Sequence, residues 1–106
     1  MISDERTERA VEYIRDHAQL VGQLKGRRLQ LEHLMKVTKA QIFLRSDGTV
    51  AERQAIAEAH PEYIGMITEY RNCVTELETT LAYIKSADLT VEVWRTQAAN
   101  QRRGNI

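Results

Sequence analysis

The sequence has few of the residues that constrain a chain covalently or locally. It contains one cysteine, one proline and five glycines in 106 residues, and aromatic residues make up only 6%. The single cysteine, Cys73, excludes an internal disulfide and a zinc site built from spaced cysteines. We expect Cys73 to behave as a small apolar residue at the edge of a helix contact rather than as a reactive thiol.

Long apolar runs are also missing from the sequence. None approaches the roughly 18 residues that a transmembrane helix requires. The acidic start over residues 1–6 also lacks the basic flank of a signal peptide. We therefore expect a cytoplasmic protein with no membrane partner.

Motifs of catalysis are a third absence. The sequence has no glycine-rich phosphate loop and no nucleophile elbow. The three histidines, His17, His33 and His60, are scattered, and the acidic residues do not combine with them into the carboxylate and histidine set of a metal-binding bundle. We expect no enzymatic activity, no cofactor and no metal site.

What the sequence does contain is helical patterning. Hydrophobic residues make up 42% of the chain and charged residues 28%, which is typical of a soluble helical protein. Over residues 61–101, apolar side chains recur at alternating spacings of four and three, a heptad pattern that predicts one long helix facing a partner. The predicted contact row comprises Tyr63, Ile67, Tyr70, Val74, Leu77, Leu81, Ile84, Val91 and Ala98. Only Asp88 and Arg95 interrupt it.

The same spacing predicts a first long helix over about residues 4–44, which begins after Ser3 as the N-cap. Its contact row comprises Ala10, Ile14, His17, Val21, Leu24, Arg28, Leu31, Met35, Thr38 and Ile42. Gly22 and Gly26 lie within this helix and indicate either a close helix approach or a bend. The pattern ends at a turn that contains Gly48, which can take a positive φ.

A short helix is predicted between the two long ones. Thr49 and Glu52 form a capping-box pattern that starts a helix over about residues 50–59. His60-Pro61 ends it and begins the long helix, which we expect over about residues 61–100 and followed by a basic tail at 101–106. Residues 1–106 then form a single helical domain.

These elements predict an all-α fold, an antiparallel two-helix coiled-coil hairpin with a short helix at the turn. In the register that we favour, His17 lies opposite Asp88 and Leu24 lies opposite Leu81, within one chain or between swapped chains of a dimer. A shift by one heptad would place His17 opposite Leu81 instead.

Apolar residues beside the contact rows predict oligomerisation. A lone hairpin cannot cover all of them, so we expect a dimer or larger assembly that completes a bundle. They are Val11, Ala18, Leu20, Leu34, Ile64, Met66 and Trp94.

Basic residues form one candidate site on the first helix. The net charge is zero, yet residues 17–45 are rich in cations. The candidate nucleic-acid-binding residues here are Lys25, Arg27, Arg28, Lys36 and Lys39. Four of them share one side of a helix and could follow a phosphate backbone. The alternative is an ordinary solvated face neutralised by acids of the other helix, with Glu78 beside Arg28.

A second candidate group lies near the end of the chain, where Trp94 and Arg95 precede Arg102 and Arg103. An exposed tryptophan among arginines could stack on an unpaired base or anchor a protein partner. The alternative is that Trp94 covers a subunit contact or packs on Tyr13.

Three segments, at residues 10–15, 59–63 and 92–102, resemble a group of small helical proteins of tailed bacteriophages and prophages. The similarity spans most of the chain and includes the distinctive run Trp94-Arg95-Thr96-Gln97. It implies an accessory role in phage recombination and single-stranded-DNA metabolism in the bacterial host cell. It implies no catalytic or ligand-binding residues.

Two functions follow as expectations. The first is a non-enzymatic accessory protein that binds single-stranded DNA or helps load DNA-binding proteins, through the two basic groups. The alternative is a protein-binding inhibitor of a host nuclease or defence complex, acting through the acidic face of the long helix. Possible partners are therefore single-stranded DNA, a phage or host protein of DNA metabolism, and copies of this chain.

Overall fold

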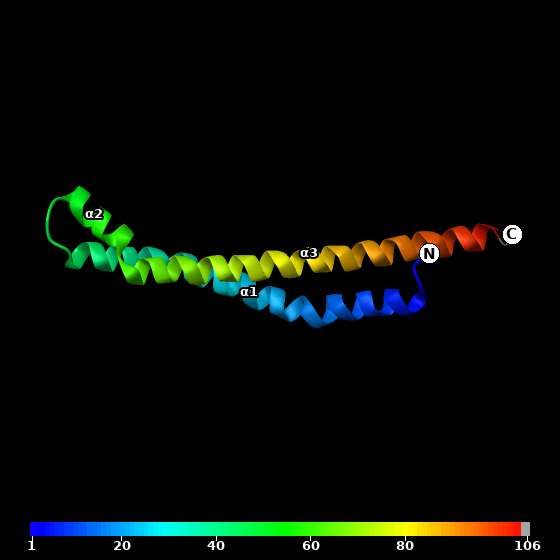
Figure 1. Ribbon diagram of the computed structural model, residues 1–106. Coiled ribbons are helices and arrows are strands. Elements are labelled where there is room, and N and C mark those ends of the chain that lie inside the picture. Colours follow the sequence, from blue (N-terminus) through cyan, green and yellow to red (C-terminus); the bar gives the residue numbers. More distant parts are fainter. Residues whose placement is uncertain (105–106) are drawn as a thin grey trace. The chain divides into compact units, whose positions relative to one another are not determined.

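The structure, a computed structural model, describes residues 1–104 of the chain. It contains three helices, α1 (Asp4–Arg45), α2 (Val50–Ala59) and α3 (Pro61–Gly104) (Figure 1). None of the described residues forms a strand, so the all-α prediction is confirmed. The predicted basic tail is wrong over residues 101–104, which continue α3, and Asn105 and Ile106 lie outside the described residues. Over residues 1–104, no helix is both long enough and apolar enough to cross a membrane.

The helix N-termini are capped by the residue types that the sequence indicates. Ser3 Oγ accepts a hydrogen bond from the Arg6 N–H at 3.1 Å, which satisfies one of the backbone donors at the start of α1. Thr49 Oγ1 accepts from the Glu52 N–H at 3.1 Å at the start of α2, as predicted. Each cap is followed by a carboxylate in the first helical turn, where the helix dipole favours negative charge.

The turn between α1 and α2 depends on Gly48. Its φ is 117°, a conformation that side chains with a Cβ rarely adopt. A Cβ at this position would also lie 2.5 Å from Glu52 Oε2. Glycine is therefore required here by both backbone and space, which confirms the predicted turn.

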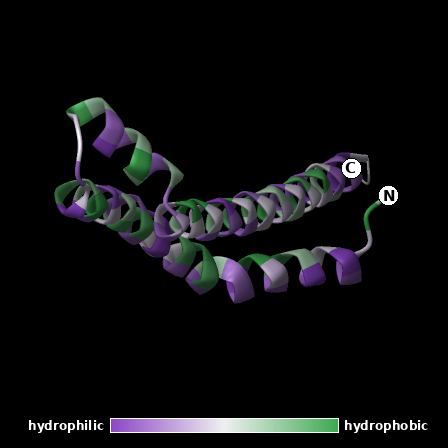
Figure 2. Ribbon diagram, turned by 60° about the vertical axis from the view of Figure 1, so that its left-hand side comes forward, coloured by the Kyte–Doolittle hydropathy of each residue, from purple (hydrophilic) through white to green (hydrophobic). Residues whose placement is uncertain are grey.

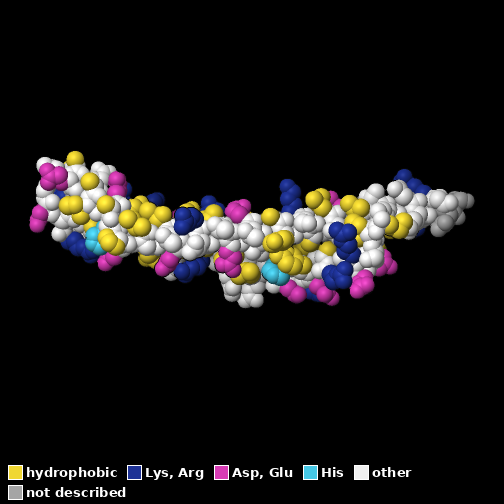
Figure 3. Space-filling model, in the orientation of Figure 1, with side chains coloured by type: hydrophobic (Ala, Val, Ile, Leu, Met, Phe, Trp, Pro, Cys, Tyr) yellow, Lys and Arg dark blue, Asp and Glu magenta, His cyan; other side chains and the backbone are white. Residues whose placement is uncertain are grey.

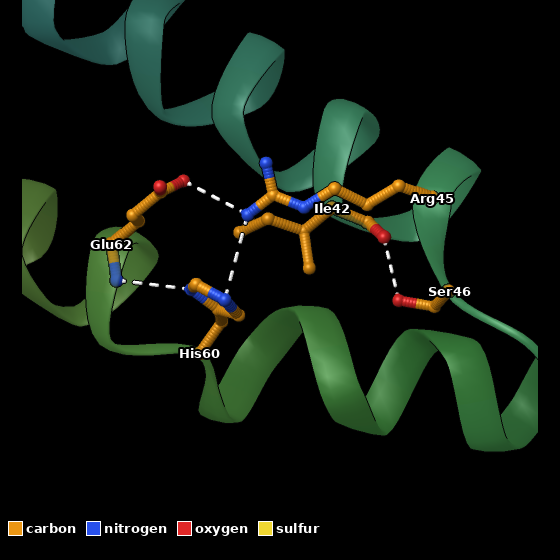
Figure 4. Close-up of polar contacts among 5 residues, drawn as sticks. All are labelled: Ile42, Arg45, Ser46, His60 and Glu62. Atoms are coloured by element: carbon orange, nitrogen blue, oxygen red, sulfur yellow. Dashed lines mark hydrogen bonds and ion pairs between the residues drawn. The ribbon is translucent and has the colours of Figure 1, made fainter.

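The junction between α2 and α3 is built around His60 (Figure 4). Its backbone N–H donates to Ala57 O at 3.4 Å, and its Nδ1 accepts from the Glu62 N–H at 3.1 Å. His60 thus caps the end of α2 and the start of α3. Arg45 Nη2, from the last turn of α1, lies 3.2 Å from Glu62 Oε2, so an ion pair joins the end of α1 to the start of α3.

The described chain divides into two compact units. Unit 1 contains Met1–Gly22 and the described residues from Glu78 onward, and unit 2 contains Gln23–Leu77. Within each unit, contacts pair rising numbers on α1 with falling numbers on α3, so the two helices run in opposite directions there. Tyr13 meets Tyr83 and Asp4 meets Trp94 in unit 1.

Unit 2 holds most of the apolar core. Its buried apolar residues are Leu24, Leu31, Ile42, Ala57, Cys73 and Leu77. In unit 1 the residues buried most deeply are Thr7, Thr80 and Ala87, which are small or polar. Hydrophobic and hydrophilic residues alternate along each helix in Figure 2, because only one stripe of each helix faces its neighbour.

The predicted contact row of α3 is wrong at every second position. Cys73, Thr80 and Ala87 are buried, and Cys73 contacts Leu24 of α1, where the sequence pattern had favoured their neighbours Val74, Leu81 and Asp88. Val74 and Leu81 are half-buried and Asp88 is exposed. The row shifts by one residue at these positions because this removes Asp88 from the contact and leaves its carboxylate in water.

Contacts at Trp94 in unit 1 and at Cys73 in unit 2 differ from the predicted register by about one heptad. Asp4 bonds to Trp94 in unit 1, and Leu24 O accepts from Cys73 Sγ at 3.4 Å in unit 2. The favoured register would have paired Asp4 with Gln101 and Leu24 with Leu81. His17 does not pair with Asp88: its ring stacks on Tyr13, with Nδ1 2.8 Å from Tyr13 O.

Gly22 and Gly26 are not explained by a close approach of any residue in the range 1–104. A Cβ built on either one would meet nothing within 4 Å. Each glycine therefore destabilises the helix relative to alanine, and no packing contact among the described residues explains its presence.

Candidate functional site

The basic residues of α1 are largely paired with carboxylates in unit 2. Each pair leaves the two side chains partly exposed, so it neutralises charge but contributes little stability. The pairs are Arg27–Glu69 at 3.4 Å, Arg28–Glu32 at 3.4 Å and Lys39–Glu58 at 3.1 Å. Lys25 and Lys36 are exposed and have no ion pair with another described residue. Of the candidate nucleic-acid-binding residues of α1, only these two lysines are therefore free of ion pairs with described residues. The acids that neutralise the others come from all three helices.

Arg28 occupies a different environment from the one expected. Its partner is Glu32, one turn along α1, and not Glu78. The Tyr70 hydroxyl donates to Glu32 Oε1 at 2.9 Å, which joins α3 to this pair. Tyr70 first and then Glu32 raise the pKa of the Arg28 guanidinium above its ordinary value. The group is a fixed cation whose charge is already matched within unit 2.

Trp94 is half-buried rather than exposed among arginines. Its Nε1 donates to Asp4 Oδ1 at 2.7 Å, a short bond to a charged acceptor. Beside it, Ile2 N donates to Gln97 Oε1 at 3.1 Å, so the first residues of the chain lie along α3 in unit 1. The indole therefore has a structural role within the chain, although Trp94 also lines a groove with Val11. Sequence reasoning missed Asp4, since this pairing depends on the helix register.

The three arginines of the second candidate group remain free of ion pairs within residues 1–104. Arg95, Arg102 and Arg103 are exposed, and none has a hydrogen bond or ion pair with another described residue. Arg102 lines a shallow groove with Trp94 and Gln101. These side chains belong to α3 itself, so they extend from a helix and not from a loose tail.

Histidines and acids do not gather into a chemical site. Over residues 1–104, no group of three or more His, Cys, Asp and Glu side chains is placed to hold a metal ion. His17 stacks on Tyr13 with ring centroids 3.9 Å apart, and Tyr13 meets the edge of Tyr83 at 6.2 Å. This aromatic group of unit 1 was not predicted, because Tyr13 and Tyr83 lie outside both heptad rows.

Apolar side chains are the most extensive unpartnered feature. Among the described residues, twelve large apolar side chains are exposed, whereas only seven apolar residues are buried. The most exposed within the helices are Leu44 at 74%, Val50 at 68% and Leu29 at 67%. Of the residues that predicted oligomerisation, Val11, Leu34 and Ile64 are exposed, and Leu20, Met66 and Trp94 are half-buried.

Charge is mixed over the surface that Figure 3 shows, where Lys and Arg side chains are interspersed with Asp and Glu. This agrees with the zero net charge of the sequence. A mixed surface does not produce the one-signed field that steers nucleic acid toward a basic protein.

Comparison with known proteins gives no relative for this chain: no family model, curated protein or solved structure matches it.

Proposed function

We propose that this chain is a non-enzymatic helical binding module that acts by contacting other protein chains, copies of itself among them. The observation that carries the proposal is the excess of exposed large apolar side chains over buried ones. Exposed apolar surface on a small protein marks an interaction site. A chain of this length also buries a modest core alone and gains stability from a partner.

The proposed architecture is an antiparallel two-helix coiled-coil hairpin with α2 at its turn, completed into a bundle by a second copy. The opposite directions of α1 and α3 within each unit and the heptad spacing of their buried residues support it. Light scattering at tens of micromolar measures the mass directly. We expect a mass of at least twice the 12.2 kDa of one chain. A mass of one chain at that concentration contradicts the proposal.

The cellular role that we propose is that of an accessory factor of phage DNA metabolism in the bacterial cytoplasm, which binds a phage or host protein. The resemblance of residues 92–102 to phage proteins supports this role. A protein partner now takes precedence over DNA, since Arg27, Arg28 and Lys39 are ion-paired and Trp94 bonds to Asp4.

Single-stranded DNA is the second candidate partner, and a specific observation favours it. Among the predicted nucleic-acid-binding residues, five cations are exposed and have no ion pair with another described residue: Lys25, Lys36, Arg95, Arg102 and Arg103. Such side chains can release counterions from a phosphate backbone. Arginines beside a partly accessible indole could also hold a stacked base.

A salt titration with a fluorescent single-stranded oligonucleotide tests the DNA candidate. If DNA binds, affinity falls steeply with salt, and Lys25→Glu with Lys36→Glu lowers the slope by somewhat under one for each lost contact. Trp94→Ala would instead weaken binding with little change in slope if the ring stacks on a base. Absence of binding at about 50 mM salt, where electrostatic binding is strong, removes this candidate.

A further inference from the structure

A row of alternating charge runs along one side of α3. Its members are Arg71, Glu78, Lys85 and Glu92, spaced by seven residues, so the sign changes at every step. Residues seven apart on an α-helix differ by only about 20° around its axis. All four side chains are exposed, and none makes an ion pair or side-chain hydrogen bond with another described residue. The helix thus presents four exposed charges of alternating sign that have no partner among the described residues.

Apolar side chains accompany this charge row. Val74 and Leu81 fall between its members and are half-buried, and Leu89 is 52% exposed. Ala82, next to Leu81, is exposed and small enough to permit a close helix approach. Apolar residues flanked by charges at heptad spacing are the pattern that helices use to choose a partner and an orientation.

We propose that a second copy of this chain docks on the charge row, with its α3 antiparallel to the first and a two-fold axis beside Leu81 and Ala82. This inference rests on the proposed self-association and names the surface that performs it. Glu78 then meets the partner's Lys85, and Arg71 meets the partner's Glu92. The two-fold axis repeats each pair, so all four charges of both copies are matched. Val74 faces Leu89 of the partner subunit in the same register.

The order of the charges selects this arrangement over its neighbours. A parallel pairing in register would put each residue of the row against its own copy, so every contact would join like charges. An antiparallel pairing shifted by one heptad would put Glu78 against the partner's Glu78 and Arg71 against the partner's Lys85. Like charges in contact oppose association, so the sequence disfavours both alternatives. A two-fold contact needs a self-complementary patch, and the charge row is one.

Charge reversal tests the docking surface without disturbing the buried core. Glu78→Lys makes both Glu78–Lys85 contacts repulsive in a homodimer, and Lys85→Glu does the same with the opposite sign. We expect each single variant to raise the dissociation constant of the dimer about tenfold or more at low salt, by sedimentation equilibrium. The double variant restores opposite charges at every contact, so we expect it to dimerise like the wild type.

Mixing the two single variants gives a sharper result. In the heterodimer, one contact joins Glu78→Lys to Lys85→Glu and the other joins the native Lys85 to the native Glu78. Both contacts then join opposite charges, so the mixture should form a heterodimer that is more stable than the homodimer of either variant. Asp16→Lys is the control: it makes the same charge change at an exposed residue of α1 that has no ion pair with a described residue. We expect it to leave dimerisation unchanged. Circular dichroism checks that each variant keeps its helicity.

The outcomes separate the surface from the self-association on which it rests. If the wild type dimerises and the single reversals do not weaken the dimer, the charge row is not the docking surface, although self-association stands. The same conclusion follows if the double variant fails to recover dimerisation. A monomeric wild type overturns both. Weaker association in the single variants, with recovery in the double variant and in the mixture, supports the proposal, since a parallel contact in register would still join like charges in the double variant.

Discussion

The packing of unit 2 predicts a large difference between two leucines of the same helix. Leu31 is 2% exposed in the contact between α1 and α3, whereas Leu29 is 67% exposed. Leu31→Ala removes buried methyl groups and leaves a cavity, so we expect it to lower the free energy of unfolding by about 2–5 kcal/mol. Leu29→Ala makes the same chemical change on the solvent side and should alter that free energy by about 0.5 kcal/mol or less.

Urea denaturation followed by circular dichroism at 222 nm measures both variants. The protein concentration must be the same throughout, because stability of a self-associating protein depends on it. A cost at Leu29 equal to that at Leu31 would refute the assignment of the buried side of α1. Equal slopes of free energy against urea are expected, since neither substitution changes how much surface unfolding exposes.

Three further predictions follow from the helix termini and glycines. Gly26→Ala should raise the free energy of unfolding by about 1 kcal/mol, because nothing crowds a Cβ there. Gly48→Ala, its counterpart at positive φ, should lower it, and a gain at Gly48 would contradict the turn conformation. His60→Ala should cost about 0.5–2 kcal/mol through loss of the α3 cap, whereas His60→Asn, which keeps an acceptor, should cost less. Trp94→Phe loses the bond to the exposed Asp4 and should destabilise by about 0.5–1.5 kcal/mol, and a Trp94→Phe variant as stable as wild type would contradict a stabilising bond.

Local signals in the sequence were sufficient for the three helices and for all of their boundaries except the end of α3. Thr49 with Glu52, Gly48, and the pair His60-Pro61 each act within a few residues, so their effect on the backbone is readable without tertiary information. Heptad spacing likewise predicted two long helices, because it indicates a helix with one apolar face and one polar face.

The register between α1 and α3 could not be predicted from such local signals. The larger residues Val74 and Leu81 favoured one contact row, and the structure instead buries the smaller Cys73 and Thr80. Small side chains permit closer packing of helices, and the shifted row also frees α3 from burying Asp88. The signal was present in the sequence: the row with Asp88 and Arg95 was interrupted, whereas the row one residue earlier, through Cys73, Thr80, Ala87 and Trp94, has no charge.

The candidate site was predictable only as far as composition allowed. Counting charges identified the cations of α1, but which of them are neutralised depends on Glu58 and Glu69, which reach them from other helices. The bond between Trp94 and Asp4 joins residues 90 positions apart and follows from the register alone. The charge row of α3 became meaningful once the structure showed that its members have no partners among the described residues.

The distance between spin labels in the assembled protein tests the antiparallel contact of α3 most directly. In a Cys73→Ala background, a label at residue 82 should report an intersubunit distance of roughly 10–25 Å, since paired helix axes lie about 8–10 Å apart. A label at residue 103 should report about 65 Å, because the same two-fold axis places the helix ends far apart at 1.5 Å per residue. Short distances at both positions, or no intersubunit distance at either, would contradict self-association through an antiparallel pair of α3 helices.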